Sequence, residues 1–321
     1  MHVDLQADYL VHQESLLYQQ QLQILDDWLI QEDQHSVIVM IDPEVTDSMA
    51  QLSKGLEDQK IALRPIHPSL TTQPYLLQLS CDQHQRDVLN QSLLWGLTEA
   101  LADRGDIAVA RSIGFWLGGG EARLTASYVH QLKRLGQVIR PDGEQHFLRY
   151  WDPRVLPILS LILDDQQYQL LYQMLYPCLY MDWYGQLQTL SLPKRTTALS
   201  AQFMRQKFKF TTQQWQQLEQ IEWINDTIRL IKAWHQSPAE ILIPQLYSCQ
   251  QRCLAYGFSA PMDATLFVSL ASRYHWRFDQ HPLVNRRLQP PHAAKTLGQA
   301  LQKITSDDWQ QIRQDLASHS G

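Results

Sequence analysis

The segment from Gln137 to Leu156 constrains the fold more than any other part of the chain. Two stretches that alternate between apolar and polar residues, 137–140 and 145–151, flank the turn Pro141-Asp142-Gly143-Glu144. Proline presets φ in such a turn and Gly143 accepts a positive φ, so the pattern predicts an antiparallel hairpin. Alternate residues of its second strand should face opposite sides, with one face formed by Phe147, Arg149 and Trp151.

The hairpin is followed directly by Asp152-Pro153-Arg154 and an apolar helical pattern. Aspartate is typical of an N-cap and proline of the first helical position. We therefore predict structural roles for Asp152, Pro153 and Gly143. An acid–base or anion-binding pair of Asp152 with Arg154 is the alternative, and the capping role makes it unnecessary.

The pattern before the hairpin mixes helices and short apolar strands. Apolar residues at helical spacing, Leu16 among them, predict a helix over 16–30, and the β-branched run Val37–Ile41 predicts a buried strand. The further expected elements are a strand at 74–79, a helix at 86–102, a short strand at 107–110 and a helix at 124–135.

The pattern after the hairpin is almost entirely helical. The stretch from Thr189 to Ser200 lacks periodicity, and we place a linker there, with domains at 1–190 and 191–321. Helices are expected after the capping pattern at Thr211 and over 238–256, 264–274 and 306–317. The fold class is therefore α+β: a mixed α/β N-terminal domain with a β-hairpin, followed by an all-helical C-terminal domain.

Composition narrows the function. The 27 Lys and Arg against 33 Asp and Glu, without a long basic run, disfavour nucleic acid as a partner. No leader-like or membrane-spanning apolar run occurs, so we expect a cytoplasmic chain that does not bind a membrane. The cysteines lack zinc-site spacing, and they are expected to be buried as small apolar residues, at Cys81, Cys178, Cys249 and Cys253.

Known catalytic patterns do not appear. Gly118-Gly119-Gly120 precedes a helix, but neither GxGxxG nor GK[ST] accompanies it, which favours a hinge over a phosphate loop. The histidines lie in no HExxH motif, and no GxSxG nucleophile is present. The aromatic stretch 180–184 has no basic neighbours and favours packing over base stacking. We therefore expect a protein that is not an enzyme and that holds no cofactor or metal.

Four neighbouring stretches carry a family resemblance: 119–124, 128–135, 138–143 and 147–156, the last reading Phe-Leu-Arg-Tyr-Trp-Asp-Pro-Arg-Val-Leu. They resemble the type VI secretion effector adaptors, also called Tap or VasW-like adaptor chaperones and formerly a domain of unknown function. The stretches at 41–42 and 74–79 add weaker matches, so the resemblance covers about residues 16–180. Gln131 and Trp151 depart from the commoner residues of the pattern.

The resemblance implies an adaptor that binds a cognate toxic effector and promotes its loading onto the VgrG spike or its PAAR protein, without catalysis. Two alternatives stay open on the sequence. One is an immunity-type toxin-binding protein, and the other is a small-molecule hydrolase with an unrecognised site.

Partner contacts are expected at large or charged side chains of both halves. The candidates are Arg149, Trp151, Arg154, Trp215, Trp223, Trp234, Tyr247, Tyr256 and Phe258. Because the second half holds more aromatic residues than short helices need, we expect partner choice to lie from about Ala201 onward, with a partner helix in a groove.

Overall fold

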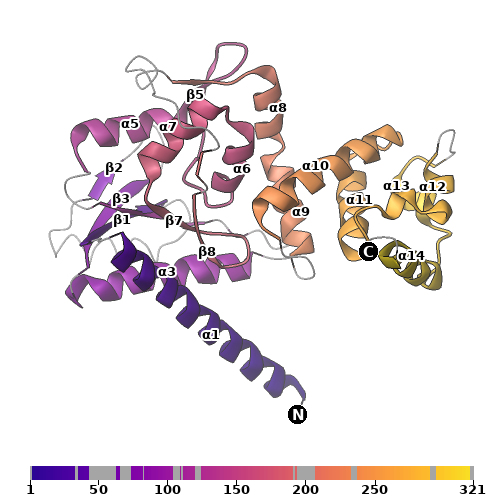
Figure 1. Cartoon of the computed structure of the whole chain (residues 1–321), viewed down its shortest axis with the longest axis horizontal. Coiled ribbons are helices and arrows are strands. Elements are labelled where there is room, and N and C mark those ends of the chain that lie inside the picture. The colour runs from indigo at the N-terminus through magenta and orange to yellow at the C-terminus, as the bar shows by residue number, and fades with distance from the viewer. Residues whose placement is uncertain are drawn as a thin grey trace. The chain divides into compact units, whose positions relative to one another are not determined.

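The computed structural model describes residues 2–32, 35–42, 63–65, 74–81, 83–103, 109, 111–119, 124–190, 192–193, 207–232, 237–289 and 294–318. The chain divides into two compact units (Figure 1). The first contains residues 1–103 and 109–219, and the second consists chiefly of residues 220–321.

An antiparallel sheet forms the centre of the first unit. Within the described residues it has six strands in the order β2-β3-β1-β4-β7-β8. Their bounds are β1 Ser36–Ile41, β2 Leu63–Pro65, β3 Tyr75–Ser80, β4 Ile113–Gly118, β7 Cys178–Met181 and β8 Leu187–Thr189. The central strand β1 pairs with β3 on one side and β4 on the other, and its residues 37–41 are all buried. Burial on both faces explains why this run is continuously apolar.

Helices cover both faces of this sheet. Val37, Val39 and Ile41 belong to a core with α1 (His2–Gln31) and α3 (Gln83–Ala102). Ile38 and Met40 point the other way, into a core with the helices of the opposite face. Those helices are α5 (Ala126–Gly136), α6 (Leu156–Ile162) and α7 (Asp165–Leu175).

The strand expected at 107–110 is not where the third strand of the sheet lies. Of that stretch the structure describes only Val109, and it places β4 at Ile113–Gly118. Gly114 lies in the middle of this strand, and an internal glycine weakens the β pattern of a sequence. The fully buried Trp116 fixes the strand, because its Nε1 donates to Ser92 Oγ of α3 at 2.9 Å.

The predicted hairpin is present as part of a second, three-stranded sheet. Strand β5 (Gln137–Ile139) pairs antiparallel with β6 (Gln145–Phe147) and parallel with β9 (Phe208–Lys209). Gly143 has φ +89°, as the turn requires. Helix α8 (Thr212–Glu219) follows β9, with the predicted reciprocal hydrogen bonds between Thr211 and Gln214.

Strand β9 and helix α8 place the division of the chain later than position 190. The Gln214 amide donates to the Ile162 carbonyl oxygen at 3.0 Å and to Gln167 Oε1 at 2.8 Å. Because these bonds hold α8 on α6 and α7, residues 207–219 belong with the α/β unit. The structural division therefore falls between Glu219 and Gln220.

The second unit is built from helices. In the described residues these are α9 Ile221–Ile231, α10 Ala239–Ala255, α11 Pro261–Arg273, α12 Pro282–Leu288, α13 Leu297–Leu301 and α14 Ser306–Ser318. Phe267 and Phe278 pack with ring centroids 4.8 Å apart, and Trp309 of α14 stacks on Tyr274 at 4.6 Å. The predicted α+β class, mixed in the first part and helical in the second, is confirmed.

The cysteines are free thiols, and the burial predicted for all four holds for three of them. Cys178, Cys249 and Cys253 are buried, whereas Cys81 is half-buried. Burial raises the pKa of the Cys249 and Cys253 thiols to about 12. Among the described residues, no helix combines the length and apolar character needed to cross a membrane.

Gly114 provides a test of the packing between β4 and the hairpin segment. A Cβ at this position would lie 2.7 Å from the Trp151 carbonyl oxygen and 2.9 Å from Met40 Cγ. Gly114→Ala should therefore lower the free energy of unfolding by about 2 kcal/mol. The control is Gly298→Ala, whose new Cβ would meet only Leu266 Cδ2, at 3.8 Å. Urea titration of both variants checks this, and equal stabilities would contradict the packing described.

Candidate functional site

Asp42, directly after β1, connects the main sheet to the segment that follows the hairpin. Arg149 Nη2 donates to Asp42 Oδ2 at 2.7 Å, and Trp151 Nε1 donates to the same oxygen at 2.8 Å. The Asp42 side chain is 3% exposed, while that of Arg149 is 41% exposed. Arg149 and Trp151 thus face one way, as predicted, and the Tyr150 hydroxyl donates instead to the Leu132 carbonyl oxygen.

A second polar cluster surrounds Asp152. Arg154 contacts this carboxylate with two donors, Nε to Oδ1 at 3.0 Å and Nη2 to Oδ2 at 2.8 Å. Arg154 Nη1 also donates to the Val109 carbonyl oxygen and lies 3.6 Å from Asp103 Oδ2. The buried Arg111 pairs with that same Asp103 oxygen at 3.6 Å. The cluster therefore joins the end of α3, the start of β4 and the segment after the hairpin.

The capping role expected of Asp152 needs correction. Helix α6 begins at Leu156, with Pro157 in its first turn, whereas residues 150–155 form turns. Asp152 Oδ1 accepts the Arg154 backbone N–H at 2.9 Å, a bond that closes a local turn before the helix. The Arg154 guanidinium occupies the rest of the carboxylate. Asp152 is buried, and Pro153 lies within the turn instead of opening the helix.

Burial and charge act on these groups in opposite directions. Burial would raise the pKa of Asp152, but the hydrogen bonds and charge of Arg154 outweigh it and lower that pKa. Burial raises the pKa of Glu99, because the Ser112 hydrogen bonds and the charge of Arg111 only partly compensate. Glu99 accepts the Ser112 backbone N–H and its hydroxyl. These polar groups form hydrogen bonds and ion pairs with one another, and these contacts fix the local structure.

Two of the predicted partner-binding residues of this segment are enclosed. Trp151 is 1% exposed and packs against Phe147 and Tyr150, so its side chain belongs to the core. The Arg154 side chain is 17% exposed and fully engaged with Asp152 and its neighbours. Burial leaves Trp151 almost no side-chain surface for a partner, whereas for the half-buried Arg154 the contact stays a prediction. Arg149 keeps an accessible guanidinium.

Trp215 of α8 lies beside the hairpin. Its ring lies 5.2 Å from that of His146, edge to face, and the Arg140 guanidinium lies 4.9 Å above it. Its Nε1 donates to Glu219 Oε1 at 2.6 Å. The ring stays half-buried, while hairpin residues 141–146 are exposed. Trp215 therefore supports the hairpin and retains part of its surface.

The candidates of the second unit also separate by burial. Phe258 is 2% exposed and belongs to the core, so a partner cannot reach it. Trp223 and Tyr256 are half-buried, and they donate to Thr265 Oγ1 at 3.2 Å and to Asp279 Oδ2 at 3.2 Å. Tyr247 is half-buried as well, and burial raises its pKa to about 12. Trp234 lies outside the described residues.

The sequence prediction concentrated on aromatic residues and missed the exposed aliphatic ones. In the second unit these are Ile241 and Leu254 of α10, and Met262 and Leu266 of α11, with Met262 80% exposed. The buried stripe of α11 consists of Asp263, Ala264, Phe267, Val268 and Ala271. A helical projection would have placed Met262 and Leu266 outside that stripe. Among the described residues, no group of three or more His, Cys, Asp or Glu is placed to hold a metal ion.

The role of Asp152 can be measured against a true helix cap. Asp152→Ala should cost about 3 kcal/mol of unfolding free energy, because it leaves the half-buried Arg154 guanidinium without its main partner. Asp164 caps α7 through a capping box and is exposed, so Asp164→Ala should cost about 1 kcal/mol. Guanidinium titration compares the two. Equal costs would show that Asp152 contributes no more than a cap.

Glu99 predicts a specific pH dependence. Its raised pKa means that the folded chain holds this proton to a higher pH than the unfolded chain. The resulting stabilisation is complete below the unfolded pKa, at about 4.3, and is lost as the pH rises through the folded value. As the pH rises above about 4.3, Glu99→Gln should therefore lose less stability than the parent, as measured by denaturant titration. Parallel pH profiles would contradict this.

Comparison with known proteins identifies one segment of the chain. Residues 74–170, which run from β3 to α7, match the family described as Domain of unknown function (DUF4123). No curated protein and no solved structure matches the chain. The matched segment includes the hairpin and the residues from Arg149 to Arg154, so a DUF4123 domain is present at residues 74–170 of this chain.

Proposed function

We propose that this protein is a type VI secretion effector adaptor, which binds a cognate toxic effector and promotes its loading onto the VgrG spike or a PAAR protein. The observation that carries the proposal is the DUF4123 match at residues 74–170. The matched residues include the hairpin and the segment Arg149–Arg154, and the sequence of this segment resembles that of those adaptors.

The contacts of the segment Arg149–Arg154 support a scaffold role. Asp42 accepts hydrogen bonds from Arg149 and Trp151, and Asp152 accepts them from Arg154. The charged groups of this segment are therefore paired within the protein. A catalytic carboxylate needs access to a substrate, and Asp42 and Asp152 are both buried. The segment Arg149–Arg154 holds the hairpin on the main sheet and leaves the hairpin tip accessible to other proteins.

Partner choice is proposed to lie in the second unit. Met262 and Leu266 are one helical turn apart on α11, and both are exposed. Trp223 lies close to them, since its Nε1 donates to Thr265 on the same helix. Aliphatic residues at this spacing beside a half-buried tryptophan are typical of a surface that packs against a partner helix.

Co-purification of the full-length chain with candidate effectors and spike proteins tests the proposal. Met262→Asp and Leu266→Asp should each weaken effector binding by about tenfold, because each places a carboxylate in an apolar contact. Gln302→Asp is the matched control, since it adds the same charge at an exposed position of the same unit. Calorimetry on the purified complex measures the affinities.

Two results would contradict the proposal. One is a complex with the toxin's active domain that blocks toxicity and never includes a spike protein, which is the behaviour of an immunity protein. The other is full effector affinity in both α11 variants, which would remove the second unit from partner choice.

A further inference from the structure

Helix α1 has a second apolar face, which the first unit leaves exposed. Its buried side includes Leu25, Trp28 and Leu29, which pack in the core with α3. On the other side Leu16, Ile24 and Ile30 are 49%, 40% and 77% exposed. At 100° per residue these three positions lie within about one third of the helix circumference. Leu16, one of the apolar residues at helical spacing in the sequence, therefore lies on the exposed side of the helix.

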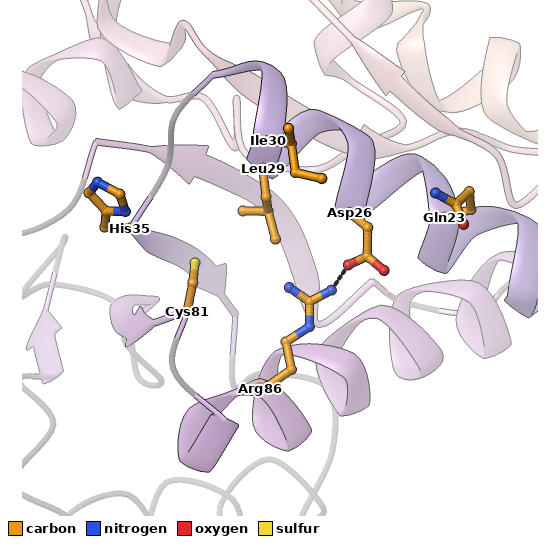
Figure 2. A pocket seen from close by; sticks show the side chains of 7 residues that line it. All are labelled: Gln23, Asp26, Leu29, Ile30, His35, Cys81 and Arg86. Atoms are coloured by element: carbon orange, nitrogen blue, oxygen red, sulfur yellow. Dashed lines mark ion pairs between the residues drawn. The ribbon is translucent and has the colours of Figure 1, made fainter.

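A groove lies beside the C-terminal part of this exposed face. It has a volume of about 610 Å³ and is lined by Gln23, Asp26, Leu29, Ile30, His35, Cys81 and Arg86. Figure 2 shows Asp26 of α1 facing Arg86 of α3, with an ion pair between them. Leu29 supplies a buried apolar wall and Ile30 an exposed one. The groove therefore combines apolar walls with polar side chains, and the charges of Asp26 and Arg86 within it compensate each other.

The charge balance of the N-terminal part of the chain is negative. Residues 1–103 contain 16 Asp and Glu but only 4 Lys and Arg. Helix α1 itself has no Lys or Arg, and Asp26 and Asp27 lie near its C-terminal end. The helix dipole adds negative partial charge at that end, and Glu32 follows it. The positive charge of Arg86 compensates the negative charge of Asp26. The Asp27 carboxylate accepts a hydrogen bond from the neutral Gln23 amide, which leaves its charge in place.

The negative charge of α1 distinguishes between two possible partners of its exposed face, a second copy of the chain and another protein. A second copy of the chain would place the same acidic helix against α1, and like charges across a helical contact are destabilising. We propose that the exposed face of α1 binds a basic amphipathic helix of another protein, with aliphatic residues against Leu16, Ile24 and Ile30 and with Lys or Arg against Asp27, which lies between them on the helix surface. The proposal does not depend on the adaptor function.

Fluorescence anisotropy with the full-length chain tests this surface. The probe is a labelled synthetic helix of about 18 residues, or five turns, with Leu at helical spacing and Lys elsewhere. The control probe carries Glu in place of Lys. We expect the Lys probe to bind at least about tenfold more tightly, with an affinity that falls as salt rises above about 0.1 M.

Substitutions locate the binding. Leu16→Ser and Ile30→Ser should each weaken the Lys probe by about fivefold or more, since each removes an apolar anchor. Asp27→Asn should reduce the salt dependence. Leu192→Ser, at an aliphatic residue that is 76% exposed and belongs to neither proposed surface, is the matched control and should change neither. Circular dichroism checks that the exposed substitutions leave the fold intact.

Four outcomes would overturn the proposal. Equal binding of the Lys and Glu probes would remove the charge argument, and absence of binding by both would remove the site. Unchanged affinity in Leu16→Ser and Ile30→Ser would place the binding elsewhere. A dimer that dissociates in Ile30→Ser, seen by sedimentation, would make a second copy the occupant.

Discussion

The buried carboxylate of Asp42 is the contact on which the arrangement of the first unit depends. It lies at the end of the central strand and accepts hydrogen bonds from Arg149 and Trp151, residues more than one hundred positions away in sequence. A buried carboxylate without donors is costly, so this acceptor strongly favours one placement of the segment after the hairpin. The tight approach of Gly114 to the Trp151 carbonyl oxygen fixes the same placement from the neighbouring strand.

Local chemistry made much of the fold predictable. The turn at Gly143, the capping pattern at Thr211 and the periodic helices of the second unit each depend on residues close in sequence, and the structure has them. The strand at Ile113–Gly118 was missed, because its glycine obscures the β pattern. The position of the domain division was missed as well, because it depends on bonds between Gln214 and α6 and α7, which no local pattern contains.

The candidate surfaces were less predictable than the fold. Residue type suggested Trp151 and Phe258 as contacts, but large aromatic rings are also the residues that fill a core, and both are buried. Exposure depends on which side of a helix meets the rest of the fold. The apolar stripes at Met262 and Ile30 therefore emerge only when the buried side of each helix is known.

The parallel pairing of β5 with β9 has a consequence for the order of folding. Val138 lies opposite Phe208, and the chain between them forms α6, α7, β7 and β8. Closing a loop of this length costs conformational entropy, which the pairing recovers only after the intervening elements have formed. On a chain emerging from the ribosome, one edge of the hairpin thus stays unpaired until residue 208 is available. Before synthesis is complete, a chaperone can bind this open edge, or another chain can pair with it incorrectly.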